Sequence, residues 1–269
     1  MAGPFCFYGT FPAMRLVAAL ALAVAAGVVC ADETEWRVPF ITTPEEVVER
    51  MLELAGTRAE DTVLDLGSGD GRIVIAAAQK FGARGMGIEL DATLVERSRE
   101  NARRAGVADR VSFVQGDVLT SDISDATVVT VYLLPQLIGQ LQPRFADELR
   151  PGTRIVSHAF AMAGWKPDRV ETMNLSKPHR GQGDESTLFL WVVPADARGT
   201  WQGGGLRLRI QQNYQQLEIE GAKRASLSGA DISWEIAEGR FRGRVEGERM
   251  TGEILGAGSA QPLVLTRRR

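Results

Sequence analysis

The chain has 269 residues, of which 44% are hydrophobic, so it is long enough to bury the core of one full α/β domain and to add a smaller module. Its net charge of −3 argues against a dedicated nucleic-acid-binding protein, because such proteins usually carry a basic face or stripe. Cys6 and Cys30 lie near the N-terminus and His158 and His179 are the only histidines, so we expect no disulfide, thiol nucleophile or metal site in the folded part.

An apolar run near the N-terminus has the features of a signal peptide. Met14 and Arg15 precede LVAALALAVAAGVV, which is too short to span a bilayer comfortably, and residues 29–31 (VCA) resemble a cleavage site. We therefore predict a signal peptide over residues 1–31, with Met14 as an alternative start, and an exported, periplasmic protein. An uncleaved leader would instead remain as a membrane contact, and a leader that is not functional would leave the protein cytoplasmic.

Residues 43–55 have the pattern of an amphipathic helix. Thr43 suits the capping position, Pro44 suits the first helical position, and Glu46 stands three residues after Thr43, as in a capping box. The apolar residues of this segment fall on one side of such a helix, namely Val47, Val48, Met51, Leu52 and Ala55. We predict that the segment forms a lid helix.

An apolar strand that ends in a glycine-rich turn is the most informative part of the sequence. The segment TVLDLGSGDGR predicts a buried strand over Thr62–Leu66 and a turn over residues 67–71, and a helix follows over Ile73–Phe81. Missing side chains let a ligand approach the turn, and the first amides of the helix face the same ligand. In dinucleotide-binding enzymes the position of Arg72 is glycine or alanine, so this turn argues against NAD and FAD.

The next part of the chain alternates apolar strands with helical segments. Further strands are predicted, in chain order, at Arg84–Glu89, Val111–Gln115, Val128–Leu133, Arg154–His158, Arg169–Met173 and Thr187–Val193. A helix over residues 135–149 is expected to break at Pro143, and His158, at the end of its strand, is expected to be structural rather than a base. The polar segment Lys177–Glu185 is expected to form a loop near the active-site rim, where His179 and Arg180 carry exposed charge or touch substrate. With the first strand, this pattern predicts an α/β, doubly wound, mostly parallel sheet of seven strands.

The pattern changes after Pro194. Short alternating runs such as LRLRI, ISWEI and FRGRV are separated by Gly, Asn and Ser, as in antiparallel strands joined by tight turns. We therefore predict a domain over residues 36–194 and a small antiparallel β module over residues 198–269.

Acidic residues recur where the predicted strands end. Asp65 precedes the glycine turn, Asp70 lies inside it, Glu89 ends the second strand and Asp117 follows the third. The carboxyl ends of parallel strands meet at one edge of a sheet, where ligands collect. Four acids there would repel a pyrophosphate but suit a sulfonium cation with an ammonium group, ribose hydroxyls and an adenine amino group. We predict S-adenosylmethionine as the cofactor, although each acid alone is equally consistent with a helix cap or a solvated turn.

Four motifs resemble those of a known family. The segments DLGSGDGRIVIAAA, GIELD, AGVADRVSF and VYLLP are similar to those of class I methyltransferases. They resemble in particular the branch that contains the lysine methyltransferases of the mitochondrial ATP synthase c-subunit and adenine nucleotide translocase, with their bacterial relatives. The resemblance extends from about Val38 to Pro194, and it implies a Rossmann-like sheet and methyl transfer from S-adenosylmethionine to a protein lysine.

The resemblance also suggests roles for single residues. Cofactor-binding roles are implied for Thr43, Asp65, Gly67, Ser68, Gly69, Asp70, Gly71, Glu89 and Asp117. Glu89 is expected to bind the ribose diol, and Asp117 is expected to bind the adenine amino group. Tyr132 lies near the end of the fourth predicted strand, just past which class I enzymes meet the acceptor, and is the candidate catalytic residue, with a ring that would wall a channel for a lysine side chain. A place in the core, or stacking near adenine, is the alternative for that ring.

Two departures from related patterns bear on the acceptor. Adenine-N6 methyltransferases carry Asn or Asp followed by two prolines where this chain has residues 132–135 (YLLP), so a base-flipping DNA enzyme is not expected. The bacterial relatives tend to carry acids at the positions of Ala159 and Ala161. We therefore expect a protein or small-molecule acceptor and no nucleic acid partner. A small-molecule methyltransferase and a non-catalytic exported binding protein are the alternatives, and the sequence leaves the acceptor, the oligomeric state and the source of exported cofactor open.

Overall fold

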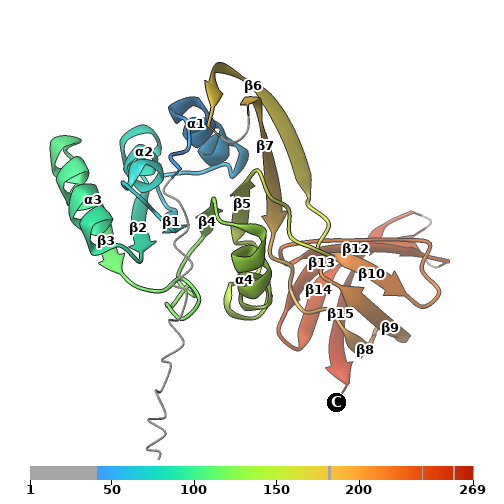
Figure 1. Ribbon diagram of the computed structural model, residues 1–269. Helices are drawn as coiled ribbons and strands as arrows, with labels where there is room; N and C mark the ends of the chain where they lie inside the picture. The colour runs from blue at the N-terminus through green and yellow to red at the C-terminus, as the bar shows by residue number, and fades with distance from the viewer. Residues whose placement is uncertain (1–40, 181–182, 238, 257, 269) are drawn as a thin grey trace, which may run out of the picture. The chain divides into compact units, whose positions relative to one another are not determined.

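The computed structural model describes residues 41–180, 183–237, 239–256 and 258–268, which form two separate β-sheets and four helices (Figure 1). The predicted signal peptide over residues 1–31 lies outside the described residues. Within the described part of the chain, no helix has the length and apolar character needed to cross a bilayer.

The first sheet has seven strands in the order β3-β2-β1-β4-β5-β7-β6. Its strands are β1 Thr62–Leu66, β2 Arg84–Glu89, β3 Val111–Gln115, β4 Val128–Val131, β5 Arg154–His158, β6 Arg169–His179 and β7 Gly183–Val192. The strands β1 to β5 pair in parallel, whereas β7 is antiparallel to both β5 and β6. The predicted doubly wound, mostly parallel sheet is therefore confirmed, and the carboxyl ends of β1 to β6 point to one edge.

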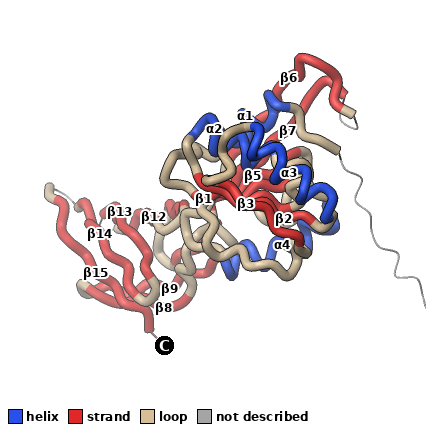
Figure 2. Tube along the Cα trace, turned by 90° about the vertical axis from the view of Figure 1, so that its left-hand side faces the viewer, coloured by secondary structure: helices blue, strands red, loops and turns tan. Residues whose placement is uncertain are grey.

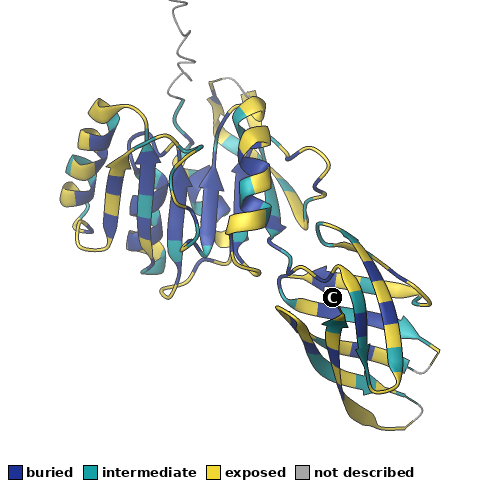
Figure 3. Cartoon of the chain, turned by 90° about the horizontal axis from the view of Figure 1, so that it is seen from below, coloured by how far each residue is buried: buried dark blue, intermediate teal, exposed yellow. Residues whose placement is uncertain are grey.

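Helices cover both faces of this sheet (Figure 2). On one face lie α1 Glu45–Leu54, α2 Arg72–Phe81 and α3 Ala92–Arg104, and on the other lies α4 Pro135–Glu148. Val48 of α1 packs in one buried cluster with Val128 of β4, and Phe145 of α4 packs in another with Val131 of the same strand. The strands are thus buried on both sides, while the outer faces of the helices remain exposed (Figure 3).

The second sheet is antiparallel and has eight strands in the order β10-β9-β8-β15-β14-β13-β12-β11. Its strands are β8 Gly199–Gly203, β9 Leu206–Asn213, β10 Gln216–Ile219, β11 Arg224–Ser228, β12 Asp231–Ile236, β13 Gly239–Glu246, β14 Arg249–Leu255 and β15 Ala260–Arg268. Alternate residues point into a separate apolar core around Trp201, Trp234 and Phe241. The predicted all-β module is therefore present.

The prediction of a loop over Lys177–Glu185 is wrong. The strand β6 continues to His179 and β7 starts at Gly183, so the two strands form a long hairpin with a register shift after Asn174. Only the part of β7 from Leu188 onward pairs with β5, and most residues of the remaining hairpin are exposed. An exposed hairpin needs no apolar alternation, which is why its sequence resembles that of a loop.

Two details of the helices also differ from expectation. The helix α4 runs through Pro143 without a break, because its buried side chains hold both halves against the sheet. At the start of α1, Pro44 is the N-cap and no side chain caps the helix. Oε1 of Glu46 instead accepts hydrogen bonds from the backbone N–H and the hydroxyl of Ser176 on β6, at 2.9 and 2.8 Å.

Candidate active site

The turn after β1 has a backbone conformation that requires glycine. Gly67, Gly69 and Gly71 have φ values of 80°, 55° and 81°, in the left-handed region that other residues rarely adopt. A Cβ on Gly67 would also come within 2.7 Å of the Leu133 side chain. The turn leads directly into α2 at Arg72, so its amides and the first amides of α2 gather at the carboxyl edge of the sheet.

Asp65 is a buried carboxylate at this edge. It is 3% exposed, and its Oδ1 accepts a hydrogen bond from the hydroxyl of Thr130 on β4 at 2.7 Å. Burial raises the pKa of Asp65 to about 7, with a further contribution from the negative charges of Glu89 and Asp70. No cationic side chain among the described residues contributes to this pKa. The site therefore suits a ligand that brings its own positive charge.

Glu89 is fixed across the glycine turn. Its Oε2 accepts a hydrogen bond from the N–H of Gly69 at 2.9 Å, and its Oε1 accepts one from the N–H of Asp91 at 3.0 Å. Each carboxylate oxygen keeps a second lone pair that can accept a hydrogen bond from a hydroxyl group. On the neighbouring strand, Asp117 follows β3 and accepts a hydrogen bond from the N–H of Leu119 at 2.9 Å. The two acids therefore follow one another along the sheet edge.

Asp70 forms an ion pair with Arg72. Nε and Nη2 of Arg72 donate to the two carboxylate oxygens at 2.8 and 2.6 Å, while Nη1 donates to the carbonyl oxygen of Thr43 at 2.7 Å. Burial disfavours the ionised form of Asp70, but the hydrogen bonds from Arg72 outweigh it and lower the pKa of that carboxyl. Within the described residues, the buried hydroxyl of Ser68 has no hydrogen-bond partner. Asp70 thus orients Arg72 toward the segment before α1, and the Ser68 hydroxyl has bonding capacity for a ligand.

Three aromatic rings gather at the ends of β4, β5 and β6. The ring centroid of Tyr132 lies 4.2 Å from that of His158 and 6.1 Å from that of His179, and the two histidine rings are 5.8 Å apart. Nε2 of His158 lies 3.0 Å from the hydroxyl of Ser186 on β7. Nε2 of His179 donates to the carbonyl oxygen of Thr42 at 2.8 Å. Tyr132 therefore lies in a cluster of three rings at this edge of the sheet.

The sequence interpretation gave neither histidine this place. His158 was expected to be structural, and His179 was expected to lie in an exposed loop, whereas they are 0% and 9% exposed. The sequence could have indicated the cluster only through strand ends. His158 ends the fifth predicted strand, and His179 would end the sixth if that strand were extended from Met173 to His179. Among the described residues, no group of three or more His, Cys, Asp or Glu side chains converges in a way that would hold a metal ion.

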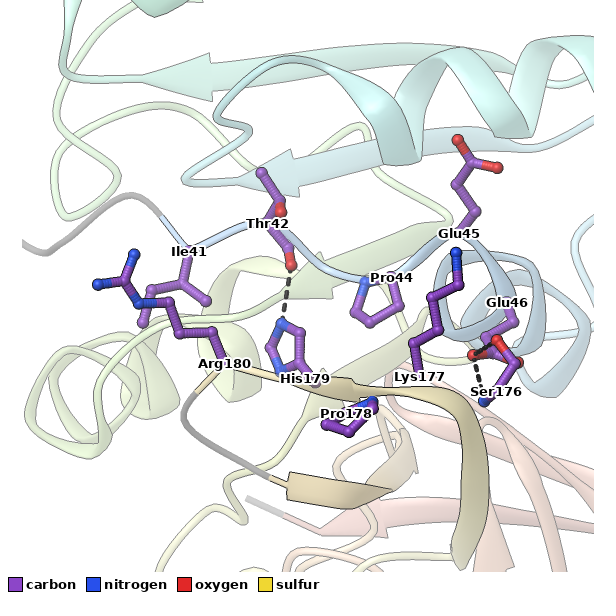
Figure 4. Close-up of a pocket in the computed structure, with 10 residues that line it drawn as sticks. All are labelled: Ile41, Thr42, Pro44, Glu45, Glu46, Ser176, Lys177, Pro178, His179 and Arg180. Carbon is purple, nitrogen blue, oxygen red and sulfur yellow. Dashed lines mark hydrogen bonds between the residues drawn. The ribbon is translucent and has the colours of Figure 1, made fainter.

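A pocket of about 870 Å³ lies between the segment that enters α1 and the end of β6 (Figure 4). It is lined by residues 41, 42 and 44–46 on one side and by residues 176–180 on the other. Glu45 and Glu46 supply negative charge, and Lys177 and Arg180 supply positive charge. The pocket shares His179 with the aromatic cluster, so the two adjoin one another.

Known proteins share this arrangement of strands and motifs. A family profile described as the ANTKMT methyltransferase domain matches residues 65–169. A protein-lysine N-methyltransferase from Saccharolobus islandicus is 46% identical over 160 residues, which make up 58% of this chain and 94% of that protein. This chain belongs to the ANTKMT family of class I methyltransferases.

Two further relatives of the methyltransferase show how far the similarity extends. The crystal structure of an RNA methyltransferase from Salinibacter ruber in complex with S-adenosyl-L-homocysteine is 51% identical, has a TM-score of 0.53, and covers 58% of this chain and 95% of its own. The ATP synthase c-subunit lysine N-methyltransferase of Xenopus laevis is 33% identical over 162 residues, which make up 60% of this chain and 68% of that protein. The methyltransferase is thus an enzyme that uses S-adenosylmethionine.

The residues at the carboxyl edge fit this cofactor. The buried Asp65 carboxylate lacks a cationic neighbour among the described side chains, and the cofactor carries an ammonium and a sulfonium group. The carboxylate of Glu89 is held rigidly by two backbone amides beside the turn. The left-handed glycines give the turn the backbone path that brings its amides to this edge. These groups would hold the amino acid portion, the ribose and the body of the cofactor.

Proposed function

We propose that the methyltransferase transfers the methyl group of S-adenosylmethionine to the side-chain amine of a protein lysine. The observation that carries this proposal is the 46% identity to a protein-lysine N-methyltransferase of which the chain spans 94%. The similarity to the ATP synthase c-subunit lysine N-methyltransferase of Xenopus laevis supports the same class of acceptor. Protein lysine is therefore the first acceptor to test.

The acceptor side has the character that a lysine requires. The rings of Tyr132, His158 and His179 offer an aromatic surface against which an aliphatic stem packs and a cation is attracted. The adjoining pocket opens between Glu45 and Lys177 on its two walls, which suits a polar polypeptide carrying charges of both signs. Tyr132 is the proposed catalytic residue because it directly follows the central strand β4 and its ring belongs to this cluster.

Methyl transfer to an amine depends more on alignment of the amine with the methyl group than on acid–base catalysis. When bound, the cofactor supplies an electrophilic methyl carbon, to which the neutral amine nitrogen bonds while the carbon–sulfur bond breaks and sulfur keeps the electron pair. Asp65, Glu89 and Asp117 would fix the donor from one side, and Tyr132 would orient the amine from the other. The proton that the methylated ammonium then loses passes to solvent. Desolvation of the amine between rings raises its reactivity because the neutral form is favoured there.

Transfer of labelled methyl groups tests the proposal. Residues 32–269 are incubated with methyl-labelled S-adenosylmethionine and a cell lysate, and the product is divided between protease and ribonuclease treatment. We expect the label to resist ribonuclease, to be released by protease and to lie on lysine by mass spectrometry. Tyr132→Ala should lower this rate far more than it lowers cofactor affinity, whereas a glycine-turn variant should lower both.

The other outcomes identify different acceptors. Label that is lost on ribonuclease treatment would replace lysine by RNA, the acceptor class named for the Salinibacter ruber relative. Label in a dialysable product would replace it by a small molecule. Either result contradicts the lysine proposal, while cofactor turnover itself would still be present.

We also propose that the enzyme acts outside the cytoplasm. The apolar run after Met14 and the small-residue site before Asp32 support this location. Its acceptors would then be envelope or secreted proteins.

A further inference from the structure

The segment that enters α1 is fastened at two consecutive carbonyl groups. The carbonyl oxygen of Thr42 accepts a hydrogen bond from Nε2 of His179 at 2.8 Å (Figure 4), and that of Thr43 accepts one from Nη1 of Arg72 at 2.7 Å. We call residues 41–44 the strap. Arg72 starts α2 beside the glycine turn, whereas His179 ends β6 in the ring cluster. The strap therefore joins the donor side of the site to the acceptor side.

The Arg72 anchor belongs to the donor side. Arg72 is held by both carboxylate oxygens of Asp70, at 2.8 and 2.6 Å, and Asp70 lies inside the turn. Thr43, whose carbonyl oxygen receives the third Arg72 bond, is itself 4% exposed. A chain of charge-assisted hydrogen bonds thus fixes this end of the strap to the backbone that faces the cofactor.

The His179 anchor belongs to the acceptor side. A carbonyl oxygen only accepts, so Nε2 of His179 carries the proton of this bond. The ring is 9% exposed and lies 6.1 Å from Tyr132 and 5.8 Å from His158, measured between centroids. Thr42 and His179 both line the 870 Å³ pocket, so the bond between them forms part of its wall.

We propose that His179 is a positioning residue for methyl transfer, which ties the strap to the end of β6 through the carbonyl oxygen of Thr42. Without this bond the strap is still held by Arg72 at Thr43 and by the first turn of α1 at Pro44, but residues 41 and 42 lose their tie to β6 and sample open positions. The cofactor then loses part of its enclosure, and the acceptor amine loses a fixed wall. This role holds whichever acceptor is used, because it concerns the strap and the donor.

Three variants separate the hydrogen bond from the ring. His179→Phe keeps an aromatic ring and removes the donor, His179→Ala removes both, and His179→Gln keeps an N–H at a similar reach without the ring. Arg180→Ala is the matched control, because Arg180 lines the same pocket and is exposed. The readouts are hydrogen exchange at the amides of residues 42, 43, 45 and 46 in the cofactor-free protein, and the dissociation constant of S-adenosyl-L-homocysteine by calorimetry.

We expect His179→Phe and His179→Ala to speed exchange of these amides several-fold and to weaken S-adenosyl-L-homocysteine binding about three- to ten-fold, the range of one net hydrogen bond. His179→Gln and Arg180→Ala should stay within about two-fold of the parent in both. The proposal would be overturned if both His179→Phe and His179→Ala kept the amide exchange rates and the S-adenosyl-L-homocysteine affinity of the parent. Equal losses in His179→Gln and His179→Phe would also overturn it, since the donor would then be irrelevant. None of these results depends on finding a methylated lysine.

Discussion

At the scale of single residues, the most consequential group is the carboxylate of Asp65. Burial raises its pKa to about 7, above the value of about 3.9 in an unfolded chain. The folded, cofactor-free protein therefore holds a proton that the unfolded chain releases. Its contribution to stability is complete below about pH 4, is lost as the pH rises to about 7, and does not change further above that.

Asp65→Asn should remove this pH dependence. The variant keeps an oxygen to accept the Thr130 hydroxyl but has no charge to bury. As the pH rises from 4 to 8, the free energy of unfolding of the cofactor-free parent should fall by on the order of 2–4 kcal/mol relative to that of the variant. Urea unfolding measures both. The other titrating groups are common to both proteins and cancel. A difference that is constant across this range would show that Asp65 has an ordinary pKa.

Ala159 lies directly after β5 with a φ of 71°, in the left-handed region. This conformation costs an L-residue about 1–2 kcal/mol, while glycine, asparagine and aspartate adopt it more easily. Ala159 therefore stores backbone strain beside His158. No local sequence pattern reveals this, because the φ value is set by how β5 meets β7.

Ala159→Gly should therefore stabilise the protein. We expect the free energy of unfolding to rise by about 0.5–1 kcal/mol, the relief of left-handed strain less the extra entropy of glycine in the unfolded chain. Ala161→Gly is the control, because Ala161 is exposed and has no positive φ, and it should stabilise nothing. If both substitutions destabilise equally, the left-handed strain at Ala159 is absent.

At the scale of elements, local patterns predicted most of the seven-stranded sheet. The strands β1, β2, β3 and β5 and the glycine turn are correct because buried parallel strands are short apolar runs and left-handed turns need glycine. The strand β4 ends at Val131, two residues before its predicted end. The β6–β7 hairpin was missed because its exposed residues lack alternation. The capping box was wrong because Glu46 finds a partner in Ser176, which is distant in sequence and is brought close only by folding. The place of His179 depends on that same hairpin.

The helix α4 allows a test of how tertiary packing overrides a helix breaker. Pro143 lies inside the helix, is exposed, and lacks the N–H that the helix would use. Pro143→Ala restores that hydrogen bond and should raise the free energy of unfolding by about 1–3 kcal/mol in denaturant titrations. Gln140→Ala, at an exposed position of the same helix, should change it by less than about 0.5 kcal/mol. Destabilisation by Pro143→Ala would mean that the proline itself fits a strained backbone.

At the scale of the whole molecule, the proposed export of the enzyme depends on the predicted signal peptide. We expect deletion of residues 14–31 to keep the protein in the cytoplasm, whereas the full chain should appear outside it with a new N-terminus at Asp32, because the apolar core and small-residue site are the export features of that segment. Cell fractionation with N-terminal sequencing measures both. Intact protein that starts at Met14 and stays in the cytoplasm would exclude the extracytoplasmic proposal.

The whole molecule also brings two cores together in one chain. Tyr214, between β9 and β10, stacks on Trp165 with ring centroids 4.3 Å apart, and its hydroxyl accepts a hydrogen bond from Nε2 of Gln142 on α4 at 2.8 Å. The sequence predicted an all-β module but not these contacts, because the local sequence around each aromatic residue does not indicate which distant residue it will contact. They make the second sheet part of the packing around α4.

The central claim is that the carboxyl edge of the seven-stranded sheet holds S-adenosylmethionine with Glu89 on the ribose. Isothermal titration of residues 32–269 with the cofactor tests it most directly, with Glu96→Ala as a control at an exposed glutamate of α3. We expect one binding site in the parent and the control. Glu89→Ala should bind about 10- to 100-fold more weakly, which corresponds to losing a charge-assisted pair worth about 1.5–3 kcal/mol. A Glu89→Ala protein that is folded and binds as tightly as the parent would contradict the account.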